Sequence, residues 1–323
     1  QGAMPDDFYL NPGNKLEREI KWGIKSENGG KKEILDLYDN LMVLLQSGKV
    51  VYGDELSAYA KSVAQRLLAD DPALFARLRF YTLKENTAAA FSTRDGMIFI
   101  STGLISQLSN EAELAFLLGR EIAHIKKEHA RDIFRWRYSN PEFRVSEYEV
   151  YGTEIEKEAD NDAIELLHRA GYSEEGVLSA FTVLIYSYIP FNDIPLDFNF
   201  FYANTIHFPA YKTAIKPVPI TSYDQLNGII SPYYSLKKRS DGCDAQIVRH
   251  SNWGKALFLV ADETTFKQLS KIGKYESVSI DINRHAYTNA LYSVYLLQKE
   301  DPNAYYLRKM KLLALLGAWN YIN

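Results

Sequence analysis

A long helix that begins near Asn110 constrains the fold of this chain more than any other segment. Asn110 is a suitable N-cap, and Glu113 follows three residues later as its capping-box partner. A broad apolar face follows, formed by Leu114, Leu117, Leu118, Ile122 and Ile125. Because the first half of this helix is apolar on almost every side, we expect it to be buried among other elements. After Ile125 the sequence becomes strongly charged.

The composition is typical of a soluble globular protein. The chain has 323 residues, 46% of them hydrophobic and 24% charged, which allows a sizeable core and two domains. A formal net charge of −4 argues against a nucleic-acid-binding protein, which would need a basic surface. We interpret the one short basic run, residues 237–239, as a solvated turn. The single cysteine, Cys243, excludes an intramolecular disulfide and a cysteine metal cluster.

The remaining elements indicate an α+β fold that is mostly helical with a small sheet. Strand patterns occur at residues 78–83 and 97–100, and a second long helix is expected at about residues 154–169. Two helices at residues 287–299 and 304–316 form a hairpin of the tetratricopeptide kind. An array of such repeats needs about three units, so we interpret the single unit as a helical cap that packs on the main domain.

These patterns predict four regions along the chain. Residues 1–4 resemble the remnant of a cleaved expression tag, and residues 5–45 form an N-terminal helical segment. Residues 46–225 form the main domain, and residues 226–323 form a C-terminal helical region. No stretch approaches the roughly 18 continuous apolar residues of a membrane helix, so no transmembrane segment is expected.

The long helix carries a motif that departs by one residue from the zinc-protease pattern H-E-x-x-H. Residues 120–124 read R-E-I-A-H, with Arg120 in place of the first histidine. In the full pattern, positions i and i+4 share a helix face, so both imidazoles reach one zinc ion. The glutamate then takes a proton from the metal-bound water, a role that would fall to Glu121. Alone, the shorter pattern x-E-x-x-H is weak.

The surrounding sequence resembles the family of membrane-stress and prenyl-protein zinc endopeptidases that includes HtpX and BepA. The resemblance rests on "FSTRDGMIFISTGLISQLSNEAELAFLLGREIAHIKKEHARD" at residues 91–132 and on "EIEKEADNDAIELLHRAGYS" at residues 154–173. It covers roughly residues 50–215 and implies a zincin-like peptidase fold. It also favours an extracytoplasmic or periplasmic location.

The resemblance also implies roles for individual residues. His124 and Glu156 stand at zinc-ligand positions, Asp160 stands where an aspartate orients the site, and His207 is placed near the cleft. Three departures stand beside these matches. Arg120 replaces a ligand, Ala89 stands where the family has an asparagine, and Phe208 separates His207 from Pro209.

Arginine changes what such a site can hold. A guanidinium offers no lone pair and stays protonated, so Arg120 cannot bind zinc. His129 lies about 140° around the helix from His124 and is expected to face elsewhere, and Glu128 lies a turn too far away. We therefore expect no cofactor, unless the site is functional after all and binds zinc. Arg120 is expected to form a salt bridge with Glu156 in place of the metal.

Three functions fit these observations. The first is a non-catalytic homologue of a zinc metalloendopeptidase, whose cleft binds a peptide or a protein segment. The second is an active metalloendopeptidase with an unusual zinc site, or one whose histidine has been exchanged for arginine in this chain. The third is a scaffold protein that works through its C-terminal helices.

Overall fold

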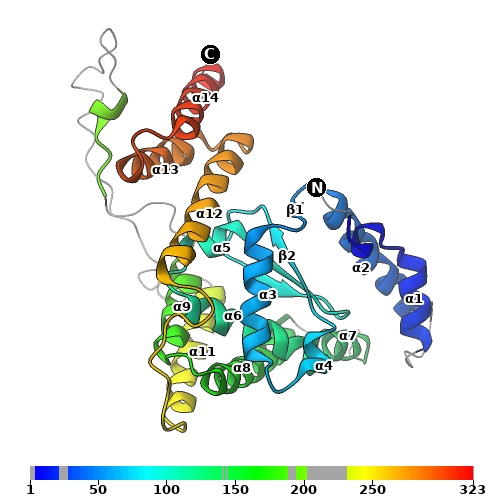
Figure 1. Cartoon of the computed structure of the whole chain (residues 1–323). Coiled ribbons are helices and arrows are strands. Elements are labelled where there is room, and N and C mark those ends of the chain that lie inside the picture. The colour runs from blue at the N-terminus through cyan, green and yellow to red at the C-terminus, as the bar shows by residue number, and fades with distance from the viewer. Residues whose placement is uncertain are drawn as a thin grey trace.

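The computed structural model describes residues 4–21, 28–139, 142, 145–187, 194–201 and 231–322. Within these ranges the chain is mostly helical, with one small mixed sheet (Figure 1). This confirms the α+β class predicted from the sequence. None of the helices in the described ranges combines the length and the apolar character that crossing a membrane requires.

The sheet has four short strands in the order β1-β2-β4-β3. The strands are β1 (Val50–Val51), β2 (Arg79–Leu83), β3 (Ala90–Ser92) and β4 (Met97–Ser101). β2 and β4 run parallel in the middle, and β1 and β3 pair with them antiparallel at the two edges. All five residues of β4 are buried. The two central strands match the predicted strand segments, whereas the edge strands were not predicted.

Helix α6 (Glu111–Lys126) is the centre of the domain, and every residue from Glu111 to Ala123 is buried. It packs against α3 (Glu55–Leu67), α8 (Val145–Ala170) and α9 (Glu175–Tyr186). As predicted, the Asn110 side chain caps the helix by accepting a hydrogen bond from the Glu113 amide at 3.0 Å. Gly119 lets α8 approach closely, because a Cβ there would lie 3.2 Å from Ala163.

Further helices lie before and after these elements along the chain. They are α4 (Pro72–Phe75), α5 (Thr102–Gln107), α7 (His129–Ser139) and α11 (Ser231–Ile247), with the 3-10 helix η2 at Phe198–Phe201. At the N-terminal end, η1 (Asp6–Tyr9), α1 (Pro12–Lys21) and α2 (Asn28–Gln46) precede the sheet. Buried side chains of α2 share a second apolar cluster with β1, β2 and β4. The N-terminal helices therefore pack beside the sheet.

The C-terminal helices are α12 (Glu263–Asn283), α13 (Tyr287–Glu300) and α14 (Tyr305–Ile322). In Figure 1 the pair α13–α14 projects from the end of α12, away from the sheet. The three helices share a separate apolar cluster. Their positions agree with the two helices predicted near the C-terminal end of the sequence, while the tetratricopeptide-like character and the division into four regions stay predictions.

Candidate functional site

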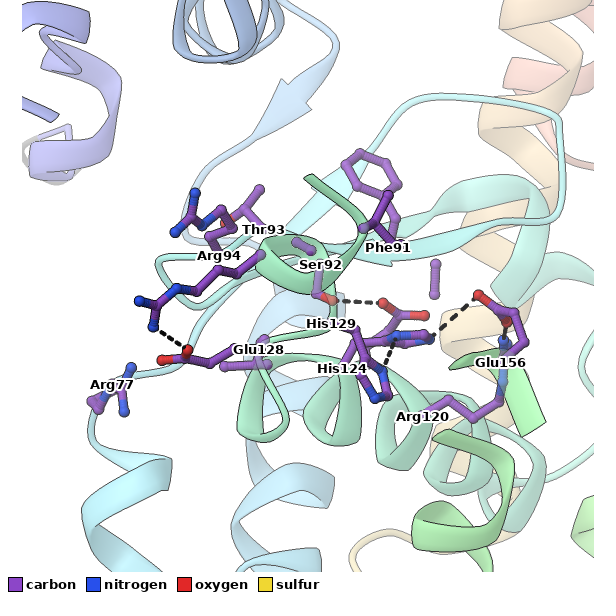
Figure 2. A pocket seen from close by; sticks show the side chains of 16 residues that line it. Arg77, Phe91, Ser92, Thr93, Arg94, Arg120, His124, Glu128, His129 and Glu156 are labelled. Atoms are coloured by element: carbon purple, nitrogen blue, oxygen red, sulfur yellow. Dashed lines mark hydrogen bonds and ion pairs between the residues drawn. The ribbon is translucent and has the colours of Figure 1, made fainter. Parts of the chain in front are cut away.

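A cleft of about 480 Å³ lies between the edge strand β3 and helices α6 and α7. Its lining includes Phe91 and Ser92 of β3, together with Arg120, Glu121 and His124 of α6. Figure 2 shows Arg120 and His124 directed at Glu156, which reaches the cleft from α8. The x-E-x-x-H segment of α6 therefore lines the cleft, and so does Glu156, one of the two acidic positions predicted on the second helix.

Arg120 lies between the two acidic side chains of α8. Its Nε donates to Asp160 Oδ1 at 2.8 Å, and its Nη2 donates to Glu156 Oε2. Arg120 is 8% exposed and Asp160 is 1% exposed. Because a buried charge is stable only when it is paired, these contacts hold α6 and α8 together electrostatically.

A second arginine completes this cluster and corrects one sequence interpretation. Arg239 does not lie in a solvated turn, because residues 237–239 are inside α11 and Arg239 is buried. Its guanidinium makes two hydrogen bonds to Asp160, at 2.7 and 2.8 Å, and lies 3.0 Å from Glu156 Oε2. The helical spacing of Leu236, Arg239, Cys243 and Ile247 was the signal that could have indicated an inward face.

Glu121 is buried beside this cluster and points towards β3. Its Oε2 accepts a hydrogen bond from Ser92 Oγ at 2.8 Å. Burial raises the pKa of Glu121 to about 7, although Arg120 and the Ser92 hydrogen bond act in the opposite direction. Close to neutral pH, this carboxyl group is therefore protonated in a large fraction of molecules.

His124 contacts both Glu156 and an imidazole that sequence reasoning had excluded. Its Nε2 lies 3.5 Å from Glu156 Oε1, and its Nδ1 lies 2.9 Å from Nδ1 of His129. The expectation that His129 faces elsewhere was wrong, because it assumed one continuous helix. Instead α6 ends at Lys126, and Glu128 adopts a left-handed φ of 56° before α7 begins. Burial lowers the pKa of His124 to about 4, so this imidazole is neutral at pH 7.

These residues do not fit a zinc ion. Protein zinc sites use three or four His, Cys, Asp or Glu ligands. Here Arg120 offers no lone pair, Glu156 is paired with the guanidinium, and the second nitrogen of His124 contacts His129. Among the described residues, no three such side chains are arranged to hold a metal ion. The donor set supports no catalytic step through zinc.

His207 lies outside the described residues. Cys243 is buried in α11, and burial raises the pKa of its thiol to about 12. A protonated, enclosed thiol is a poor nucleophile, so Cys243 is part of the packing of α11.

In this α+β fold, helix α6 carries x-E-x-x-H, and α8, which packs against it, carries E-x-x-x-D. Residues 54–141 match the family model described as peptidase family M48. The matched region contains Arg120, Glu121 and His124 but ends before Glu156.

Two curated proteins show partial similarity. The beta-barrel assembly-enhancing protease of Yersinia pestis is 28% identical over 83 residues, which is 26% of this chain and 17% of that protein. A putative beta-barrel assembly-enhancing protease of Vibrio cholerae serotype O1 is 27% identical over 92 residues, which is 28% of this chain and 19% of that protein. The matches thus span less than a fifth of these relatives. Together with the family match, they show that part of this chain is similar to peptidase family M48.

Proposed function

We propose that this domain is a metallopeptidase relative that does not cleave peptides through zinc and that uses its cleft to bind a peptide or a protein segment. The observation that carries this proposal is the position of the Arg120 guanidinium between Glu156 and Asp160. The positive charge of Arg120 is bound to Glu156, the same carboxylate that a metal ion at this site would need as a ligand.

The electrostatics of Arg120 support the loss of metal chemistry. Burial lowers the pKa of Arg120, but the charges of Asp160 and Glu156 outweigh burial and raise it above the usual value. The guanidinium therefore remains charged at every ordinary pH and repels a divalent cation. The pKa of Glu121 is also about 7, so this carboxyl is only partly available as a base.

The edge strand supports the binding role. β3 pairs with β4 on one side, through Thr93 N to Met97 O and Ser101 N to Ala89 O. Because hydrogen bonding alternates along an antiparallel strand, the backbone groups of Ala90 and Ser92 point away from β4, towards an edge that no described strand covers. An extended peptide can add to such an edge as a further strand.

Zinc analysis tests the loss of the metal site. After incubation with zinc and desalting, we expect far less than one equivalent of zinc in the wild-type protein. We expect Arg120→His to bind about one equivalent, because it supplies a third ligand beside His124 and Glu156. Lys61→His is a matched control, because it adds an imidazole to an exposed part of α3.

The two relatives are named as proteases, so cleavage is the activity against which the proposal is tested. Stoichiometric zinc in the wild-type protein, together with zinc-dependent cleavage of labelled casein, would contradict it. If Arg120→His stays free of zinc while wild type also lacks it, the site has lost more than one ligand and the non-catalytic proposal stands.

A further inference from the structure

One end of the cleft carries a group of positive side chains, which we call the arginine mouth and define as Arg77, Arg94 and Arg131. Arg77 follows α4, Arg94 lies in the turn between β3 and β4, and Arg131 belongs to α7. All three line the cleft. In Figure 2, Arg77 and Arg94 lie at the end of the cleft away from Arg120 and Glu156.

The charge of this mouth is opposite in sign to that of the whole chain. Glu128 is the carboxylate that lines the cleft beside these arginines, and Arg131 Nη1 donates to it at 2.7 Å. Among the described residues that line this end of the cleft, three therefore carry a guanidinium group and one carries a carboxylate, on a chain whose formal net charge is −4. A local excess of positive charge along a concave surface attracts anionic ligands and orients them.

The arginine mouth lies next to the end of β3. Arg94 is two residues beyond Ser92, whose backbone groups point away from β4. Apolar side chains line the same cleft, namely Phe91, Ile125 and Ile133. An added strand presents alternate side chains in opposite directions, about 7 Å apart on each face. Such a ligand can place acidic side chains at the arginines and apolar ones against the remaining wall.

We propose that the preferred ligand of the cleft is an acidic peptide in extended conformation, which pairs with β3 and directs its carboxylates to Arg77, Arg94 and Arg131. This inference rests on the proposed function, because it requires the cleft to bind peptides. It adds the charge of the ligand and the residues that select it.

Fluorescence anisotropy with three labelled octapeptides tests the proposal. The probes alternate valine with glutamate, glutamine or lysine. At 50 mM NaCl we expect the glutamate peptide to bind at least about tenfold more tightly than the lysine peptide. Its affinity should decline at 0.5 M NaCl, because salt screens exposed charges. Binding of the glutamine peptide should change little with salt.

The double variant Arg77→Gln/Arg94→Gln identifies the residues. We expect it to bind the glutamate peptide roughly three- to tenfold more weakly, as exposed ion pairs are lost. Its unchanged binding of the glutamine peptide would show that the cleft is still folded. Arg249→Gln is the matched control, because it removes an exposed arginine that contacts Gln246 and does not line the cleft.

The possible failures are distinguishable. Equal affinity for all three peptides would overturn the acidic preference and leave the peptide-binding cleft in place. Absence of binding by every peptide would overturn both this inference and the binding role, whereas the zinc analysis would stand independently. A short oligothymidylate that binds as tightly as the glutamate peptide, and is weakened equally by the double variant, would overturn the assignment to a peptide.

Discussion

At the scale of single residues, the site is organised around charges that have to be buried together. Asp160 accepts hydrogen bonds from both Arg120 and Arg239, and Glu156 lies against the same two guanidinium groups. Two carboxylates and two guanidinium groups balance each other, which is the condition for keeping them inside a protein. Glu121 is buried beside this cluster, and burial raises its pKa although both guanidinium groups act in the opposite direction.

Glu121 should give the stability of the protein a pH dependence. Its pKa rises from 4.5 to about 7 on folding, mainly because it is buried. Between these values the folded chain holds a proton that the unfolded chain has lost, so the free energy of unfolding decreases as the pH rises. Glu121→Gln removes this titration and preserves an acceptor for Ser92. The difference in the free energy of unfolding between the variant and wild type should therefore shift in favour of the variant by up to about 3 kcal/mol as the pH rises from 4.5 to 8.

Urea denaturation at several pH values measures this difference. The lowered pKa of His124 acts in the opposite direction, since it stabilises the fold above about pH 6.5 and the effect is lost as the pH falls towards 4. Both proteins contain His124, so its contribution largely cancels in the comparison. A difference in stability that stays constant from pH 4.5 to pH 8 would contradict the role of Glu121.

Helical spacing accounts for part of this cluster but not all of it. The pairs at positions 120 and 124 and at positions 156 and 160 each share a helix face, so both sets can be placed at one site from the sequence. Arg239 could not be placed in the same way. It is separated from Asp160 by 79 residues, and its neighbours Lys237 and Lys238 are exposed. Because Arg239 belongs to a run of basic residues, the sequence did not indicate that its side chain is buried.

At the scale of elements, the junction between α6 and α7 determines how the cleft is lined. Lys126 ends α6, and the left-handed backbone at Glu128 redirects the chain so that His129 returns towards His124. The charged sequence after Ile125 contains no glycine or proline to mark this break. Sequence reasoning therefore extended the helix and placed His129 incorrectly.

The backbone at Glu128 predicts an unusual order of stabilities. Left-handed φ values are strained for side chains, most of all for β-branched ones, and are accessible to glycine. We expect Glu128→Gly to be more stable than Glu128→Val by about 1 kcal/mol. Both variants lose the contact with Arg131, so their difference reports on the backbone. Thermal or urea unfolding measures it.

The same two substitutions at Lys61 provide the control. Lys61 is exposed in the regular helix α3, where glycine is less favourable than valine. The order of stabilities should therefore reverse, with Lys61→Gly the less stable variant. An identical order at both positions would show that Glu128 is not held in a left-handed conformation in solution.

At the scale of the whole molecule, one buried carboxylate joins segments that are far apart in sequence. Glu111 is 0% exposed at the start of α6. It accepts hydrogen bonds from the hydroxyls of Tyr59 in α3 and Tyr172 after α8. It also accepts three backbone bonds, from the amides of residues 259, 260 and 261. The segment that leads into α12 is thereby fastened to the central helix.

This role of Glu111 was not visible in the sequence. An acidic residue in the first turn of a helix is common, because it interacts favourably with the helix dipole. Its backbone donors follow it by about 150 residues, and no local spacing connects them to α6. The strand and helix types could be predicted from local patterns, whereas this attachment depends on tertiary structure alone.

Glu111→Gln should therefore weaken the attachment of the C-terminal region. A glutamine has one acceptor oxygen, and its amide group would face donors that the second carboxylate oxygen now satisfies. Leaving buried donors unpaired costs about 1–3 kcal/mol, so we expect the free energy of unfolding to fall by about 3 kcal/mol. The amides of Leu259, Val260 and Ala261 should exchange with deuterium at least about tenfold faster, because local opening becomes easier.

Glu263→Gln, in the exposed first turn of α12, should leave both the free energy of unfolding and the exchange rates nearly unchanged. If exchange at these three amides is unaffected by Glu111→Gln, the carboxylate does not fasten this segment, and the C-terminal helices are held by apolar packing of α12 on α5.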